Sequence, residues 1–128
     1  MKIIRLFSGL LIIASSFSVQ AEKVFELRTY YTHEGKLPDL LKRFEDHTLA
    51  IFEKHKITNV GYWVPSKQKN TLIYIISHES KEQADKNWQS FIADPLWKEV
   101  YAASRKNGPI VKNLTSEYLT ALNFSPLK

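Results

Sequence analysis

The order of the patterned segments constrains the fold of this chain more than any other feature. Val24–Thr32 alternates large apolar and polar side chains with a period of two, which is typical of a strand. Apolar residues then recur every three to four positions from about Leu37 to Lys54, which predicts an amphipathic helix. Such a strand and helix must pack against further strands, because neither element can bury its apolar side alone.

The remaining segments predict two more strands, a second helical region and a last strand. Ile57–Val64 and Thr71–Ser77 have the composition of strands and are joined by a short polar link, as in a hairpin. Thr71–Ser77 is apolar on both faces, which favours a central position in the sheet. Ser80–Gln83 has the pattern of a helix capping box, and the Asp94-Pro95 pair should break or kink the helix that follows. Glu117–Leu122 is the predicted last strand.

The resulting order, strand–helix–strand–strand–helix–strand, is that of a ferredoxin-like α+β fold. Both helices have one apolar face, so both should cover the same face of an antiparallel sheet. The other sheet face carries too many large side chains to remain in water. We therefore expect a homodimer in which two sheets pack face to face, as in a dimeric α/β-barrel.

The first 21 residues are predicted to be a signal peptide. Lys2 and Arg5 give a positive start, Leu6–Ala14 is apolar, and the polar stretch that follows ends in a small-x-small pattern at Ala21. The apolar run is shorter than the ~20 residues that span a bilayer, which favours cleavage over a membrane anchor. We expect a mature domain of residues 22–128 that is periplasmic or secreted and is not stably inserted in a membrane.

Composition excludes several classes of function. Loss of Lys2 and Arg5 lowers the formal net charge from +5 to +3, and the remaining lysines are scattered, so no nucleic-acid partner is expected. The absence of cysteine excludes disulfides, thiol catalysis and cysteinyl metal sites. The four histidines lack the spacing of a zinc site, and the glycines form no phosphate-binding loop. The sequence therefore predicts neither a metal nor a cofactor.

One face of the first strand carries the bulky polar residues Glu26, Arg28 and Tyr30. This face is either exposed to water, with an ordinary ion pair, or it lines a cavity or a dimer interface. The many aromatic residues are more often core than ligand box, but apolar walls with a few convergent polar groups also form small-molecule pockets. If a pocket exists, we predict that Arg28, Tyr30, Trp63 and Trp88 bind its ligand.

His47 is the candidate catalytic residue. It lies at the edge of the apolar stripe of the first helix, beside Thr48, where its side chain could reach a cavity between helix and sheet. Two interpretations remain open, a buried hydrogen-bonded histidine and a general acid or base, because histidine titrates near neutral pH. His55 at the end of the same helix is expected to pack or to cap it.

Five short motifs, in this order, are similar to those of the NIPSNAP family. They are Glu26–Tyr30 (ELRTY), Phe44–Thr48 (FEDHT), Asn59–Pro65 (NVGYWVP), Trp88–Trp97 (WxxFxxDPxW) and Phe124–Pro126 (FSP). The resemblance implies the ferredoxin-like, dimeric α/β-barrel fold but no reaction that can be carried over. Lys56 departs from the family, in which glycine often stands at this position, so we expect strain or a different helix cap there.

Three functions remain open. The first is an exported homodimer that binds a small apolar or aromatic molecule in a pocket between helices and sheet. The second, by analogy with related folds, is a cofactor-independent oxygenase- or isomerase-like enzyme acting on a small aromatic substrate. In that case His47 is the acid or base, Arg28 and Tyr30 orient an anionic or phenolic oxygen, and Trp63 and Trp88 form walls. The third is a structural or protein-interaction module without a pocket.

Overall fold

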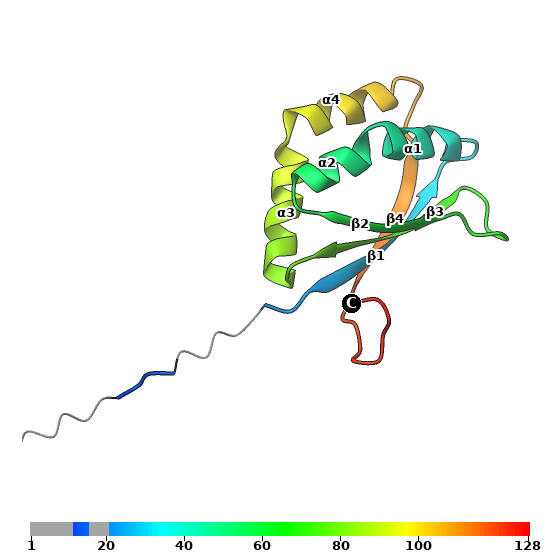
Figure 1. The fold of residues 1–128 in the computed structure, drawn as a ribbon. Helices are drawn as coiled ribbons and strands as arrows, with labels where there is room; N and C mark the ends of the chain where they lie inside the picture. Colours follow the sequence, from blue (N-terminus) through cyan, green and yellow to red (C-terminus); the bar gives the residue numbers. More distant parts are fainter. Residues whose placement is uncertain (1–11, 16–20) are drawn as a thin grey trace, which may run out of the picture.

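The computed structural model describes residues 12–15 and 21–128, and the domain begins with strand β1, Val24–Thr32 (Figure 1). The predicted signal peptide, residues 1–21, lies outside the described residues except for 12–15 and Ala21. Within the described ranges, no helix is both long enough and apolar enough to cross a membrane.

Four strands form one antiparallel sheet in the order β2-β3-β1-β4. The other three strands are β2 (Thr58–Trp63), β3 (Thr71–His78) and β4 (Val111–Leu119). The strands β1 and β3 are central, which confirms the central position expected for the third strand. This strand order, with helices between β1 and β2 and between β3 and β4, is the predicted ferredoxin-like arrangement.

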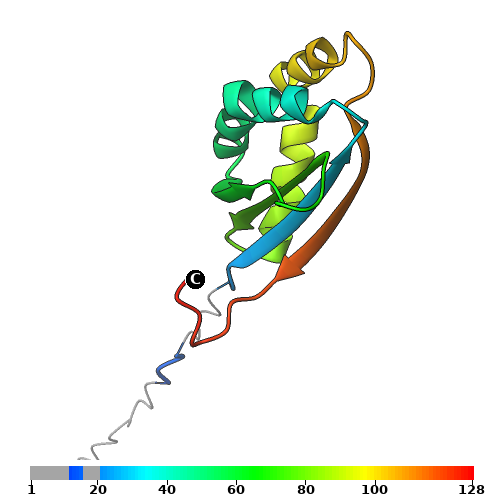
Figure 2. The same ribbon diagram turned by 90° about the vertical axis from the view of Figure 1, so that its right-hand side faces the viewer.

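All helices cover the same face of the sheet (Figures 1 and 2). The first helical segment is continuous and consists of α1 (Leu37–Arg43), the π-helical turn η1 (Phe44–Thr48) and α2 (Leu49–Lys54). The second region consists of α3 (Lys81–Ala93) and α4 (Pro95–Ser104). The predicted single helix from Leu37 to Lys54 is therefore confirmed, with a local widening at η1. Such π-helical turns frequently occur at functional sites.

The core lies between the helix layer and the sheet. Its buried hydrophobic members are Leu40, Phe44, Ile51, Phe52, Ile57, Leu72, Tyr74, Ile76, Phe91, Val100 and Ile110. Aromatic rings meet at its centre, where Phe44 lies 5.1 Å from Tyr74 and the ring of Tyr62 stacks on Tyr74 at 5.2 Å between centroids. These contacts fix η1 and β2 relative to the sheet, because offset and edge-on aromatic pairs are favourable geometries.

The junction between α3 and α4 also anchors the end of α2. Asp94 ends α3, and its Oδ1 accepts a hydrogen bond of 2.8 Å from the backbone N–H of Leu96, which caps α4. Its Oδ2 lies 2.8 Å from Lys54 Nζ and 2.6 Å from His55 Nε2. Together these three contacts hold the pKa of Asp94 well below its usual range. The predicted capping position of His55 is confirmed, since His55 is the C-cap of α2.

Two local predictions were incomplete, and the strain expected at Lys56 is confirmed. The strand β4 begins at Val111 rather than Glu117 and ends at Leu119, because backbone pairing with β1 extends through a polar, mostly exposed edge segment with no apolar alternation. Ser80 Oγ caps α3 through the N–H of Gln83 at 3.0 Å, but the Gln83 side chain donates to Asn87 instead of returning to Ser80. Lys56 adopts a left-handed conformation, with φ of 62°.

Candidate functional site

The polar face of β1 points toward the helices. Glu26 is fully buried, and the ring of Tyr30 lies 6.0 Å from that of Phe44 in η1. Of the two interpretations of this face, an exposed strand surface and a lining beneath other elements, the structure therefore supports the second. Three of the predicted ligand-binding residues, Arg28, Tyr30 and Trp88, come together here.

A hydrogen-bond network surrounds the carboxylate of Glu26. Trp88 Nε1 donates to Oε1 at 2.8 Å, Ser116 Oγ donates to Oε2 at 3.0 Å, and Arg28 forms an ion pair with Oε2. The ring nitrogen Nε2 of His78 lies 3.3 Å from Oε1. Burial raises the pKa of Glu26, but the hydrogen bonds from His78, Trp88 and Arg28 outweigh burial and lower the pKa to about 2. The carboxylate therefore remains ionised at neutral pH.

Arg28 is the cationic partner of this carboxylate. Its guanidinium carbon lies 4.5 Å from the centroid of Trp88, and Nη2 donates to the hydroxyl of Tyr30 at 3.3 Å. Burial alone would lower the pKa of Arg28, but Tyr30, Tyr74 and Glu26 raise it above its usual value. Arg28 and Glu26 thus form a buried charge pair beneath α3.

An aromatic cavity of about 420 Å³ opens between the helix layer and the sheet. We call it the aromatic pocket, and it is lined by Tyr30, Arg43, Phe44, Thr48, Phe52, Trp88, Phe91, Trp97, Tyr101, Val111, Lys112, Asn113 and Leu114. Its size and its mainly apolar walls are those of a small-molecule site. Among its lining residues, Trp88 and Tyr30 connect the pocket to the Glu26–Arg28 pair through their polar atoms.

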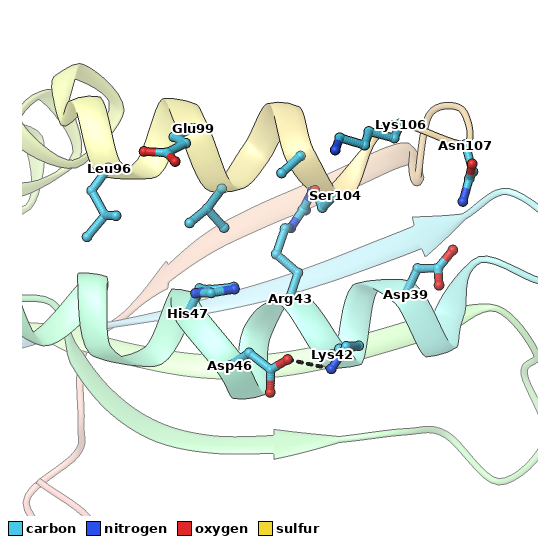
Figure 3. A pocket seen from close by; sticks show the side chains of 12 residues that line it. Asp39, Lys42, Arg43, Asp46, His47, Leu96, Glu99, Ser104, Lys106 and Asn107 are labelled. Carbon is cyan, nitrogen blue, oxygen red and sulfur yellow. Dashed lines mark hydrogen bonds and ion pairs between the residues drawn. The ribbon is translucent and has the colours of Figure 1, made fainter.

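A second cavity of about 410 Å³ runs between α1–η1 and α4 (Figure 3). We call it the α1–α4 groove, and it is lined by Asp39, Lys42, Arg43, Asp46, His47, Leu96, Glu99, Val100, Ala103, Ser104, Lys106 and Asn107. In Figure 3 the side chain of Arg43 extends from the first helix toward Ser104 on α4. Arg43 is the one residue that lines both the groove and the aromatic pocket.

Two predicted site residues lie elsewhere. His47 is exposed and lines the α1–α4 groove, not a cavity between helix and sheet, because Thr48 takes the inward position and hydrogen-bonds the carbonyl of Arg43 at 3.2 Å. Trp63 lies on the sheet face opposite the helices, because side chains alternate along β2 and Tyr62 faces the core. A Cβ added to Gly61 would clash with the Trp63 indole, which places that ring directly over the glycine.

Arg43 is the site residue that sequence reasoning missed. Its helical position suggested the polar outer side of the first helix, yet only 5% of its surface is exposed. The helix α4 covers that side, and the guanidinium carbon lies 5.5 Å from the Trp97 centroid and 5.4 Å from that of Tyr101. The available signal was the apolar stripe of the second helical region, which includes Trp97, Val100 and Tyr101 and requires a surface to pack on.

Comparison with known protein families gives a match to the NIPSNAP family model over residues 25–126. The chain belongs to the NIPSNAP family. Comparison with curated proteins gave no match. A NIPSNAP family protein with unknown function from Agrobacterium tumefaciens has a similar structure, with a TM-score of 0.73 and 24% identity over 84% of this chain and 95% of that chain.

Two further solved structures support the fold of this NIPSNAP-family chain. An uncharacterised NIPSNAP-like domain protein from Burkholderia xenovorans has a TM-score of 0.72 and 20% identity over 82% of this chain and 90% of that chain. SnoaB, a cofactor-independent oxygenase from Streptomyces nogalater, has a TM-score of 0.60 and 15% identity over 83% of this chain and 99% of that chain. At these identities the likeness concerns the fold, and it confirms the predicted ferredoxin-like α+β fold class.

Proposed function

We propose that this NIPSNAP-family protein binds a small, flat aromatic molecule in the aromatic pocket. The observation that carries this proposal is the aromatic cavity of about 420 Å³ between helices and sheet. The rings of Trp97 and Phe91 are tilted by 34° with centroids 4.5 Å apart, and the ring of Tyr101 lies 5.7 Å from that of Trp97. These rings offer a ligand the offset-stacked and edge-on contacts that aromatic groups prefer.

Replacing Trp97 with Ala is expected to weaken binding of the neutral fluorescent probe N-phenylnaphthylamine by roughly 2- to 10-fold, because one aromatic contact is worth ~0.5–1.5 kcal/mol beyond area burial. Fluorescence titration measures the affinity. Trp63→Ala is the matched control, since the same side chain is removed from the opposite sheet face. No saturable binding to the wild-type protein, or equal losses in both variants, would contradict the proposal.

Cofactor-independent oxygenation of an aromatic substrate is a second candidate function. It is favoured by the guanidinium of Arg43 at the wall of the aromatic pocket, because a cation there would stabilise a deprotonated, electron-rich aromatic ring. Dioxygen would be the oxidant and the substrate the reductant: one oxygen atom enters the product, and the other leaves as water with two substrate hydrogens.

An oxygen electrode tests this candidate with hydroxylated aromatic substrates. The role of His47 as acid or base stays a prediction, and because His47 lines the groove rather than the aromatic pocket, it requires a substrate that extends past Arg43 into the groove. An unchanged rate of oxygen uptake in His47→Ala would exclude the acid–base role of His47. Binding of the aromatic compound without oxygen uptake would favour a binding protein over an enzyme.

We also propose that the protein is a homodimer that pairs through the helix-free sheet face (Figure 2). Leu27, Tyr31, Ile73 and Ile75 lie on that face and are only partly buried. An apolar sheet face requires a covering layer, and a second sheet would supply it. Analytical ultracentrifugation at micromolar concentration should show a dimer for the wild type.

The same measurement should show a monomer for Ile73→Glu, because the new carboxylate would lie between the sheets. Ile92→Glu, on the exposed surface of α3, is the control and should remain dimeric. A clean wild-type monomer would contradict the assembly.

Export also stays a prediction, and N-terminal sequencing of the mature protein should give Glu22 as its first residue.

A further inference from the structure

Arg43 is a buried cation without an anionic partner. Its residue surface is 5% exposed, and none of the ion pairs formed by the described residues includes it. Nη1 donates to the neutral Ser104 Oγ at 3.2 Å, while Nε is buried and has no hydrogen-bond partner in the described part of the chain. The rings of Trp97 and Tyr101 interact with the charge, but neither side chain supplies a negative charge.

This situation differs from that of Arg28, a partly buried arginine whose Nε also lacks a hydrogen-bond partner among the described residues. Arg28 has the carboxylate of Glu26 as its ion partner, and its pKa is raised. Burial lowers the pKa of Arg43, and the neighbouring cation Arg105 acts in the same direction, whereas the nearby tyrosines only partly offset both effects. A buried charge without a counter-ion is destabilising. A ligand with a negative charge would supply the missing counter-ion.

We propose that Arg43 anchors a carboxylate on the aromatic ligand, which makes an aromatic carboxylic acid the ligand class of this protein. This inference rests on the proposed binding function and adds the charge and position of one ligand group. Arg43 lines both cavities, so a ligand whose ring lies in the aromatic pocket can present a carboxylate to the guanidinium. The planar guanidinium matches a carboxylate in shape and hydrogen-bonding pattern.

The charges around the groove favour a single negative charge over a phosphate. The groove side of Arg43 is lined by three carboxylates and two ammonium groups, which belong to Asp39, Asp46, Glu99, Lys42 and Lys106. Asp46 has Lys42 as its ion partner at 2.7 Å, whereas Glu99 takes part in none of the ion pairs found in residues 12–15 and 21–128. The groove lining therefore offers no surplus of positive charge, and a carboxylate tolerates this better than a dianionic phosphate does.

The experiment compares naphthoate with naphthamide, which have the same ring system and differ in charge. Each displaces N-phenylnaphthylamine from the full chain, and fluorescence reports both affinities. We expect the wild-type protein to prefer naphthoate by about 10- to 100-fold, the range that a charge-assisted hydrogen bond supplies. Arg43→Met should reduce this ratio to near one. Arg105→Met removes an exposed arginine beside Tyr101 and should retain it.

The outcomes separate this inference from the proposed function. No binding of N-phenylnaphthylamine overturns the proposed function itself. Binding of the probe with equal affinities for naphthoate and naphthamide overturns only the carboxylate anchor, and so does an unchanged ratio in Arg43→Met. If Arg43→Met fails to fold, the preference for naphthoate over naphthamide in the wild type and in Arg43→Lys still tests the carboxylate anchor. Lysine keeps the positive charge of arginine but lacks its planar pair of hydrogen-bond donors.

The thermal midpoint of unfolding distinguishes a ligand-binding role of Arg43 from a purely structural one. If Arg43 merely holds α1 against α4, Arg43→Met should lower the thermal midpoint of the unliganded protein and leave the naphthoate preference intact. If Arg43 is the anchor, removal of an unpaired buried charge should leave that midpoint at or above the wild-type value. In wild type, naphthoate should raise the midpoint more than naphthamide does.

Discussion

Arg28→Met is expected to destabilise the fold by about 3 kcal/mol, because it leaves the fully buried carboxylate of Glu26 without its cation. Methionine keeps the volume of the arginine stem, although it loses the contact of the guanidinium with the Trp88 ring. The loss should therefore reflect the charge more than the volume. Chemical denaturation followed by circular dichroism measures the free energy of unfolding, with an unchanged denaturant slope as a check on two-state behaviour.

A double-mutant cycle identifies the cause. Glu26→Gln keeps the size of the side chain and an acceptor for Trp88 while it removes the charge, so Arg28→Met should cost much less in that background. The coupling free energy should exceed about 1 kcal/mol. Arg105→Met, at an exposed site, is the charge-matched control and should stay within about 0.5 kcal/mol of wild type. Additive losses of Arg28 and Glu26 would show that the pair is not the source.

The alternation of Val24–Thr32 was sufficient to predict a strand, but not which of its faces is buried. Both faces of the strand carry bulky side chains, and a period of two shows only that the two faces differ in composition. The outcome depends on donors from distant elements, chiefly Trp88 on α3 and Ser116 on β4, which together make burial of Glu26 tolerable. The sequence pattern of one strand carries no information on hydrogen bonds to distant elements, so the role of this face had to come from the structure.

The helix positions show the same limit. A stripe of apolar residues correctly predicted the sheet-facing side of the first helix, because that side follows from a period of 3.6. Arg43 and His47 lie beside that stripe, where a second helix decides what is buried. The helix α4 covers Arg43 and leaves His47 exposed in the groove, although both residues were assigned from the same periodic pattern. Trp63 was misplaced for a simpler reason, since a single strand does not reveal which alternate face meets the helices.

Stability should fall steeply in acid because of Glu26. Its pKa is about 2 in the folded protein, whereas the ordinary value of 4.5 applies to the unfolded chain. A lowered carboxyl pKa gives stabilisation that is complete above the unfolded-state pKa and is lost as pH falls through the folded-state pKa. Since one pKa unit corresponds to ~1.4 kcal/mol, about 3 kcal/mol should disappear between roughly pH 5 and pH 2. Free energies of unfolding measured across this range by urea denaturation test the prediction.

Glu26→Gln isolates this contribution from those of other acids. The pKa of Asp94 is also lowered, by Lys54 and His55 first, so the wild-type profile contains a second acid-sensitive group that acts in the same direction. Glu26→Gln should therefore be less stable than wild type at neutral pH yet lose less stability in acid. Its deficit should shrink as pH falls. Asp46→Asn breaks an exposed ion pair with Lys42, and its free energy of unfolding should depend on pH in nearly the same way as that of the wild type. A constant deficit for Glu26→Gln at every pH would mean that the buried carboxylate is not held ionised by its network.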